Sequence, residues 1–236
     1  ILIPNQLGKY QTPSVVSYTE NGLVVGEAAK SNLILSPDQT AASFKTFMGT
    51  NKIYNLGGET YLPEELSALV IKQIVADAET FLQEPVTEAI ISVPAYFNDA
   101  QRCATKLAAQ LAGVHVERLI NEPSAAALYY QMTYGKKDGC IMVIDFGGGT
   151  LDVSVVECFE NIIEIIGIAG DNHLGGNDVD HEIAKFFCRQ NGISLENLSN
   201  EERAILYKQA EKAKIMLSAN EIATMVLVAQ LSLIHI

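Results

Sequence analysis

Positive charge is scarce in this sequence, where 16 lysines and arginines stand against 28 aspartates and glutamates, for a formal net charge of −12. The phosphate backbone of DNA or RNA attracts clustered basic side chains, so a nucleic acid is a poor candidate for the main partner. Otherwise the composition, with 48% hydrophobic and 19% charged residues, is typical of a soluble globular protein. A length of 236 residues is enough for one large domain or two small ones.

Paired cysteines are also lacking. No CxxC spacing occurs among the four cysteines, which are Cys103, Cys140, Cys158 and Cys188. The absence argues against a zinc site and a disulfide framework, and it fits a reducing, cytoplasmic compartment. We expect all four to be buried free thiols, the usual state of unpaired cysteine.

A secretory signal and a membrane span are lacking as well. The opening "ILIPNQLGKY" has neither a basic start nor a long apolar core. The longest apolar run, 222–236, is shorter than the roughly 18 residues of a membrane-spanning helix, so no membrane association is expected. We predict a buried strand there, running into a tail, 229–236, that we assign to no element. Because the chain opens as though inside a strand and ends without a polar segment, we expect a fragment at both ends.

Helical and strand-like patterns alternate along the chain, which predicts an α/β fold. Strands are predicted at 14–18, 23–26, 89–93, 116–120 and 162–168, and helices at 63–83, 98–112, from about 121, at 178–191 and at 199–217. Ser199 is a candidate N-cap for the last helix, and Glu202 completes a capping box.

The segment "VIDFGGGTLDVSVVE", residues 143–157, carries the clearest functional signal. If Gly147 to Thr150 connect two antiparallel strands, Phe146 lies opposite Leu151, and Asp145 lies opposite Asp152. Like charges directly opposed on one face destabilise a strand pair, so a cation should lie beside them. Mg²⁺ is the reasonable candidate, because it prefers oxygen ligands and keeps several waters.

The glycines of this turn complete a candidate phosphate site. Gly147, Gly148 and Gly149 carry no side chains, so their amides can approach an oxyanion closely, and Thr150 adds a hydroxyl. The segment is neither a P-loop, which would need GxxxxGK[ST], nor a dinucleotide fingerprint, which should open a helix. A plain glycine-rich hairpin with two solvated aspartates is the alternative.

Several stretches together resemble the seventy-kilodalton heat-shock chaperones of the DnaK type. They are "AASFKTFMG" (41–49), "ISVPAYFNDAQRCAT" (91–105), "LINEPSAAAL" (119–128), "IDFGGGTLDVS" (144–154), "GDNHLGGNDVD" (170–180) and "AEKAKIMLS" (210–218). Their order and spacing also match, from about residue 3 to about residue 220. The first 50 residues are most similar to the bacterial HscC-type members.

The resemblance implies an actin-like ATPase domain with a ribonuclease H-like motif, in which two lobes flank a nucleotide cleft. Residues 1–121 would form most of the first lobe and residues 122–228 part of the second. The family's first strand and first phosphate loop would precede Ile1. Its third phosphate loop and its peptide-binding domain would follow the chain, so the domain is expected to be incomplete.

The resemblance also assigns roles around the cleft. Lys45 would reach the phosphates and the attacking water, and Glu122 would lie near the metal and that water. Asp145 and Asp152 would hold water ligands of Mg²⁺ and of a monovalent ion such as K⁺. Gly147, Gly148, Gly149 and Thr150 would line the β- and γ-phosphates. Without the match, Lys45 could equally be a solvated lysine, and Glu122 a favourable first-turn acid ahead of Pro123.

Two further sets of residues follow from the resemblance. The nucleoside would be bound by Glu211, Lys214, Ile215 and Ser218, where Glu211, Lys214 and Ser218 lie at helical spacings of three and four. An exposed helix face with ion pairs is the alternative. Pro94 and Arg102 match positions linked to communication between the ATP state and peptide binding, although a proline after a strand needs no such role.

The function implied is Mg-dependent ATP hydrolysis that is coupled to peptide binding in the intact chaperone, with the fragment alone expected to be inactive. The partners implied are unfolded polypeptides, a J-domain cochaperone and a nucleotide exchange factor. A non-hydrolysing nucleotide-binding or regulatory module is the alternative. A sugar kinase of the actin-like superfamily would have the same kind of hairpin, but it does not account for "VPAYFNDAQR" or "NEPSAAAL".

Overall fold

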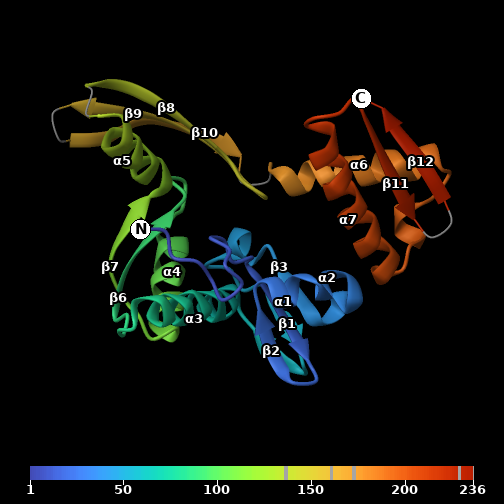
Figure 1. The fold of residues 1–236 in the computed structure, drawn as a ribbon, viewed down its shortest axis with the longest axis horizontal. Helices are drawn as coiled ribbons and strands as arrows, with labels where there is room; N and C mark the ends of the chain where they lie inside the picture. The colour runs from blue at the N-terminus through green and yellow to red at the C-terminus, as the bar shows by residue number, and fades with distance from the viewer. Residues whose placement is uncertain (136–137, 160–161, 172–173, 228–229, 236) are drawn as a thin grey trace.

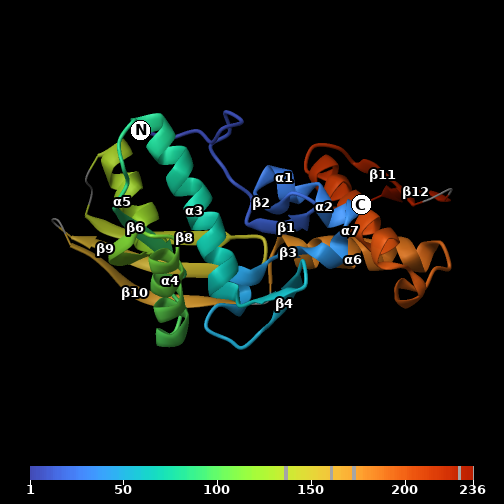
Figure 2. The same cartoon turned by 90° about the horizontal axis from the view of Figure 1, so that it is seen from below.

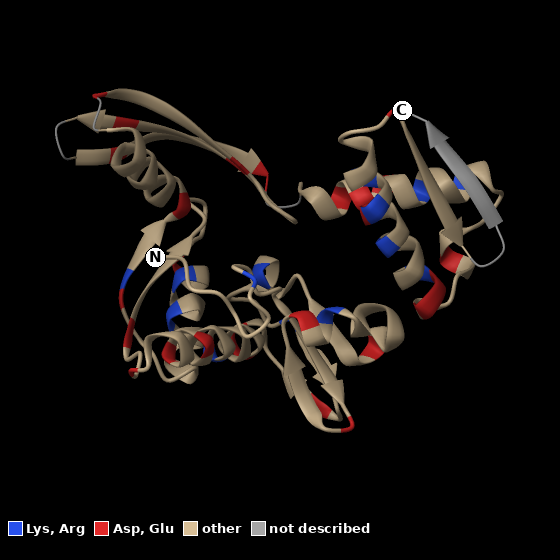
Figure 3. Cartoon of the chain, viewed as in Figure 1, with Lys and Arg blue, Asp and Glu red and all other residues tan. Residues whose placement is uncertain are grey.

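The computed structural model describes residues 1–135, 138–159, 162–171 and 174–227, and the backbone of 230–235. Within these ranges helices and strands alternate in a mixed α/β arrangement (Figure 1), as predicted. None of the helices so described is both long and apolar enough to cross a membrane. Acidic and basic side chains are interspersed along the elements (Figure 3).

The first part of the chain forms a small antiparallel sheet with helices packed beside it. The strands pair in the order β2-β1-β3, and their bounds are β1 Val15–Thr19, β2 Gly22–Val25 and β3 Thr40–Ala42. Between β2 and β3 lie α1 Glu27–Lys30, α2 Asn32–Leu35 and the 3-10 turn η1 Pro37–Gln39. The 3-10 turn η2 Phe44–Phe47, the hairpin β4 Tyr54–Leu56 and β5 Glu59–Tyr61, and helix α3 Pro63–Leu82 follow. Buried Val16, Phe44 and Leu66 form the core here.

A parallel strand pair comes next, joined by a helix. β6 Glu88–Val93 and β7 His115–Asn121 pair in parallel, and α4 Asp99–Leu111 connects them. Asn98 caps α4, since its Oδ1 accepts a hydrogen bond from Gln101 N at 3.0 Å and Gln101 Oε1 accepts one from Asn98 N at 3.0 Å. Because the strands are parallel, their carboxyl ends meet at one edge, which brings Pro94 close to Asn121.

The hairpin of the glycine turn belongs to a three-stranded antiparallel sheet. The strands pair in the order β10-β9-β8, with bounds β8 Gly139–Phe146, β9 Leu151–Phe159 and β10 Ile162–Asp171. Helix α5 Glu122–Tyr134 lies along one face of this sheet (Figure 1). Ala127 of α5 packs there with Val156 and Cys158 of β9, and all three are buried.

The last part contains two helices and a strand pair. Its elements are α6 Gly176–Gln190, the 3-10 turn η3 Leu195–Asn197, α7 Asn200–Leu217, β11 Ile222–Leu227 and β12 Gln230–His235. Phe187, Leu206 and Met225 are fully buried in its core. Helix α7 packs against α2 and η1 (Figure 2), where Asn200 Nδ2 donates a hydrogen bond to Asp38 Oδ1 at 2.8 Å.

Most predicted elements are confirmed, with ends shifted by one to three residues. The predicted Ser199 capping box is present: Ser199 Oγ accepts from Glu202 N at 3.1 Å, and Glu202 Oε2 accepts from Ser199 N at 2.9 Å. The prediction missed β3, β4, β5, α1 and α2, which are too short for a periodic pattern, and it assigned no element where β12 pairs with β11. The four cysteines are free as expected, but burial was wrong for Cys103 and Cys140, which are exposed on α4 and on edge strand β8.

Candidate functional site

The glycine turn has the predicted register. Asp145 is the direct partner of Asp152, and Phe146 is that of Leu151. The turn is closed by Gly147 N, which donates a hydrogen bond to Thr150 O at 2.9 Å. The loop length and the strand alternation together bring the two aspartates opposite each other at the end of the hairpin.

Asp152 is an acid in an unfavourable place. It is only 4% exposed, whereas Asp145 is exposed, and Asp152 Oδ1 has no hydrogen-bond partner among the residues that the structure describes. Burial raises the pKa of Asp152, and the charge of Asp145 raises it further, although a hydrogen bond from Thr150 and the charge of Lys45 act in the opposite direction. An orphaned carboxylate oxygen with excess negative charge around it is suited to a hydrated cation.

Lys45 and Glu122 meet beside these acids. Lys45 Nζ lies 2.9 Å from Glu122 Oε1, although the two residues are 77 positions apart. Lys45 is the second residue of η2, which begins directly after Ser43. The φ of Ser43 is 56°, in the left-handed region that is rare for serine. Glu122 is the first residue of α5, so the alternative reading, a first-turn acid, is compatible with this pairing. Since the charge of Lys45 also acts on Asp152, the site joins both halves of the chain.

The start of α6 holds the turn in place. Gly176 N donates to Gly147 O at 2.9 Å, and Asn177 N donates to Gly148 O at 2.8 Å. Gly175 packs so closely that an added Cβ would lie 2.4 Å from Gly149 N. No role was predicted for residues 175–177, although the glycine pair in "GDNHLGGND" was a signal. Asn172 and His173 of that stretch lie outside the described residues.

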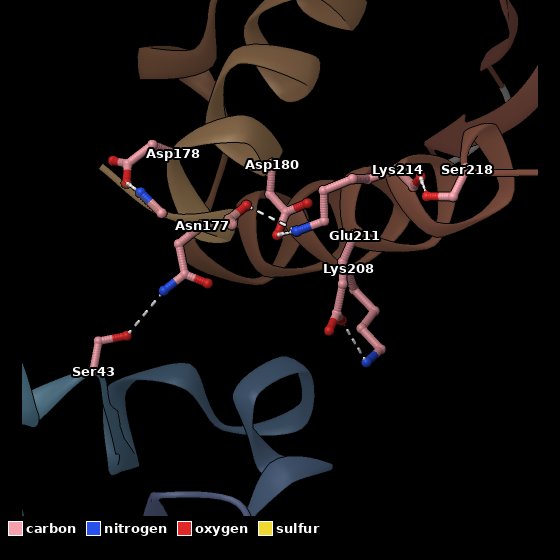
Figure 4. A network of polar contacts seen from close by, with 10 residues as sticks. Ser43, Asn177, Asp178, Asp180, Lys208, Glu211, Lys214 and Ser218 are labelled. Carbon is pink, nitrogen blue, oxygen red and sulfur yellow. Dashed lines mark hydrogen bonds and ion pairs between the residues drawn. The ribbon is translucent and has the colours of Figure 1, made fainter. Parts of the chain in front are cut away.

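Asn177 also reaches the other side of the site. Its Nδ2 donates to Ser43 Oγ at 3.4 Å (Figure 4), which connects the start of α6 to the segment that carries Lys45. One residue therefore contacts both the glycine turn and the lysine segment.

The fold itself does not require a glycine at position 148. Gly148 lies at the tip of the turn and is exposed, its φ is not positive, and within the described parts of the chain an added Cβ would meet nothing nearer than Asn177 at 3.8 Å. A ligand that approaches the backbone closely would account for the glycine. Among the described residues no group of three or more His, Cys, Asp or Glu could hold a metal. The two carboxylates suit Mg²⁺ that keeps waters among its ligands, and the bare amides suit the phosphate oxygens that accompany it.

The predicted nucleoside residues lie on α7 and at its end. Glu211 Oε2 pairs with Lys208 Nζ at 2.9 Å, as the alternative reading of an ion-paired face expects. Ile215 is 63% exposed, and Ser218 donates to Lys214 O at 3.3 Å. Lys214 is different, because its ammonium turns toward α6 (Figure 4).

Pro94 and Arg102 lie close to Asn121, the residue before Glu122. Pro94 is fully buried after β6. Arg102 donates from Nη2 to Asn121 Oδ1 at 2.8 Å and from Nε to Phe97 O at 2.9 Å. The guanidinium thereby joins the loop after β6 to Asn121, which ends β7 and precedes Glu122.

A wide surface hollow of about 930 Å³ lies beside α1. It is lined by Lys9–Pro13 with Glu27 and Lys30. It brings together none of the predicted site residues, so size alone does not identify the site.

Comparison with known proteins matches this chain to one family. The family model described as Hsp70 protein matches residues 1–232. The chain is 46% identical over 225 residues to proteins named Chaperone protein DnaK from Thermotoga petrophila and Thermotoga maritima. These alignments cover 92% of this chain and 37% of each relative, so the chain spans about a third of the length of the relatives it matches.

Proposed function

Because this chain belongs to the Hsp70 protein family, we propose that it is the nucleotide-binding ATPase region of an ATP-dependent chaperone of the DnaK type. In this proposal the region has the actin-like fold, with residues 1–121 in the first lobe and 122–228 in the second. ATP hydrolysis here is coupled to peptide binding elsewhere in the full-length protein.

One arrangement carries the proposal. A bare turn with Asp145 and Asp152 opposed beside it lies close to the Lys45–Glu122 pair. A solvated hairpin would not need a lysine and a glutamate from distant segments beside a buried carboxylate with one unsatisfied oxygen. A polyphosphate with its divalent cation requires amides, a positive side chain and carboxylates together.

The residues act by positioning and by charge, as phosphoryl transfer requires. Bound Mg²⁺ would neutralise charge on the phosphates. The amides of Gly148 and Gly149 and the hydroxyl of Thr150 bind phosphate oxygens, with Gly147 closing the turn. Lys45 offsets the charge that develops in the transition state. Glu122 and Asp152 orient the attacking water in line with the bond that breaks.

The rest of the nucleotide is proposed to lie along α7. Glu211, Ile215 and Ser218 offer an acid, an apolar surface and a hydroxyl to the ribose and base. Lys214 shares this segment, with its ammonium engaged by α6. Asp145 and Asp152 would hold Mg²⁺ through its waters, and K⁺ as a further ion.

Communication and partners belong to the proposal for the whole protein. Arg102 and Pro94 are proposed to relay the nucleotide state, supported by the bond from Arg102 to the residue before Glu122. The proposed partners are a J-domain cochaperone, a nucleotide exchange factor and unfolded polypeptides. The cytoplasmic location and the HscC-type likeness stay predictions.

Nucleotide titration in the full-length protein tests the proposal. Isothermal titration with ADP in the presence of Mg²⁺ should give saturable binding that weakens when EDTA removes the metal. Single-turnover assays should show hydrolysis of ATP without phosphate transfer to a sugar such as glucose. Binding without hydrolysis would favour the regulatory module, and a phosphorylated sugar would favour a kinase. Absence of any Mg-dependent binding would refute the proposal.

A further inference from the structure

The hydrogen bonds from α6 orient the peptide groups of the glycine turn. The carbonyls of Gly147 and Gly148 both accept bonds from α6, from the amides of Gly176 and Asn177. In a trans peptide the carbonyl and the following N–H point in opposite directions. The amides of Gly148 and Gly149 are therefore turned away from α6, and neither donates a hydrogen bond to any residue that the structure describes.

A charged pair secures this end of α6. Lys214 Nζ donates to Gly176 O at 2.8 Å and to Asp180 Oδ2 at 2.8 Å (Figure 4). The Lys214 and Asp180 side chains are 29% and 11% exposed. An added Cβ on Gly176 would lie 3.2 Å from Lys214 Nζ, so a glycine at this position leaves room for the ammonium.

Gly176 is the junction between the pair and the turn. Its N–H holds the carbonyl of Gly147, and its own carbonyl is held by Lys214. Asp180 lies one helical turn further along α6 and fixes the same ammonium from the other side. Loss of Lys214 would therefore remove a charged contact from the residue that orients the turn.

We propose that Lys214 and Asp180 are positioning residues for phosphate binding, which act through Gly176 on the orientation of the Gly148 and Gly149 amides. This inference rests on the proposed function and deepens it. It differs from the role that the resemblance gives to Lys214, a direct contact with the nucleoside. The two roles predict different ligand dependence, because a nucleoside without phosphates does not reach the glycine turn.

The experiment compares adenosine with Mg-ADP as ligands of the full-length protein, by isothermal titration. Lys214→Met and Asp180→Asn should each weaken Mg-ADP binding about tenfold or more, the scale of a lost hydrogen bond to a charged group. Adenosine affinity should stay within about twofold. Lys212→Met, which removes an exposed lysine from the same helix, is the matched control and should change neither affinity.

A double variant tests whether the two residues act as one unit. Lys214→Met with Asp180→Asn should lose little more Mg-ADP affinity than either single change, because both break the same link. Lys214→Arg, which keeps a charged donor, should recover part of the loss. Unchanged adenosine binding also shows that each variant is folded. If Lys214→Met does not fold, Asp180→Asn decides, since it keeps the side-chain shape while it removes the negative charge that holds the ammonium.

Three results would overturn the inference. Equal loss of adenosine and Mg-ADP affinity in Lys214→Met would indicate direct nucleoside contact. Unchanged affinity for both ligands in both single variants would mean that the pair does not act on the turn. Losses that multiply in the double variant would mean that the residues act independently. If the unsubstituted protein binds adenosine but not Mg-ADP, the proposed function fails, and the inference falls with it.

Discussion

Replacing Lys45 with alanine in the full-length protein should slow ATP hydrolysis with little cost in stability. The Lys45 side chain is 55% exposed, and its pair with Glu122 at 2.9 Å is open to solvent. Such pairs contribute about 0–1 kcal/mol to the free energy of unfolding, so Tm should fall by about 4 °C at most. Removal of a preorganised charge from a transition state, in contrast, costs about 2.7–4 kcal/mol, or 10²–10³ in rate.

The assay is single-turnover hydrolysis with protein in excess over labelled ATP, alongside titration with Mg-ADP and a thermal melt. Lys185→Ala is the matched control, because Lys185 also forms an exposed ion pair, with Glu182 at 2.7 Å on α6, away from the turn. We expect Lys45→Ala, but not Lys185→Ala, to slow hydrolysis, and we expect its ADP affinity to stay largely intact. A rate within about twofold of the unsubstituted protein, with ATP bound, would refute the role of Lys45.

Three more predictions concern acidity, packing and capping. Because burial and Asp145 raise the pKa of Asp152, the ligand-free protein should lose stability as pH rises through that raised pKa. Asp152→Asn should remove this dependence in melts across about pH 4 to 8 and weaken Mg-dependent ADP binding; an unaltered pH profile would contradict it. Gly148→Ala should leave Tm unchanged, since its nearest neighbour is 3.8 Å away, but lower ADP affinity in titration; intact affinity would count against a phosphate at the turn. Ser199→Ala breaks the capping box with Glu202 and should cost about 1 kcal/mol in urea unfolding without changing ADP affinity; no loss would mean that the cap is dispensable.

Local chemistry made the hairpin predictable. A short glycine loop between two alternating strands leaves few registers that keep apolar residues on one face, so the opposition of Asp145 and Asp152 could be worked out from spacing. The start of α7 was equally predictable, because the side chains of Ser199 and Glu202 each accept a hydrogen bond from the other's backbone N–H within four residues.

Burial was the harder quantity to predict. Asp145 and Asp152 look equivalent in the sequence, yet one is exposed and the other is 4% exposed with an orphaned oxygen. The two aspartates are direct partners on one face of the sheet, so strand order makes the difference: Asp152 lies on the central strand β9 and Asp145 on the edge strand β8. Alternation along β9 places Asp152 on the same face as Val156, which packs against helix α5. The same dependence on packing left Cys103 exposed, against expectation.

The α/β order of elements, the turn with its paired acids and most helix ends could be predicted from local patterns, because each depends on residues a few positions apart. The folded chain was needed to show that Lys45 reaches Glu122, that Gly176 and Asn177 hold the turn, and that Lys214 faces Asp180. These contacts join segments tens of residues apart, and they form only when separate cores bring helix ends and loops together, which no local pattern encodes.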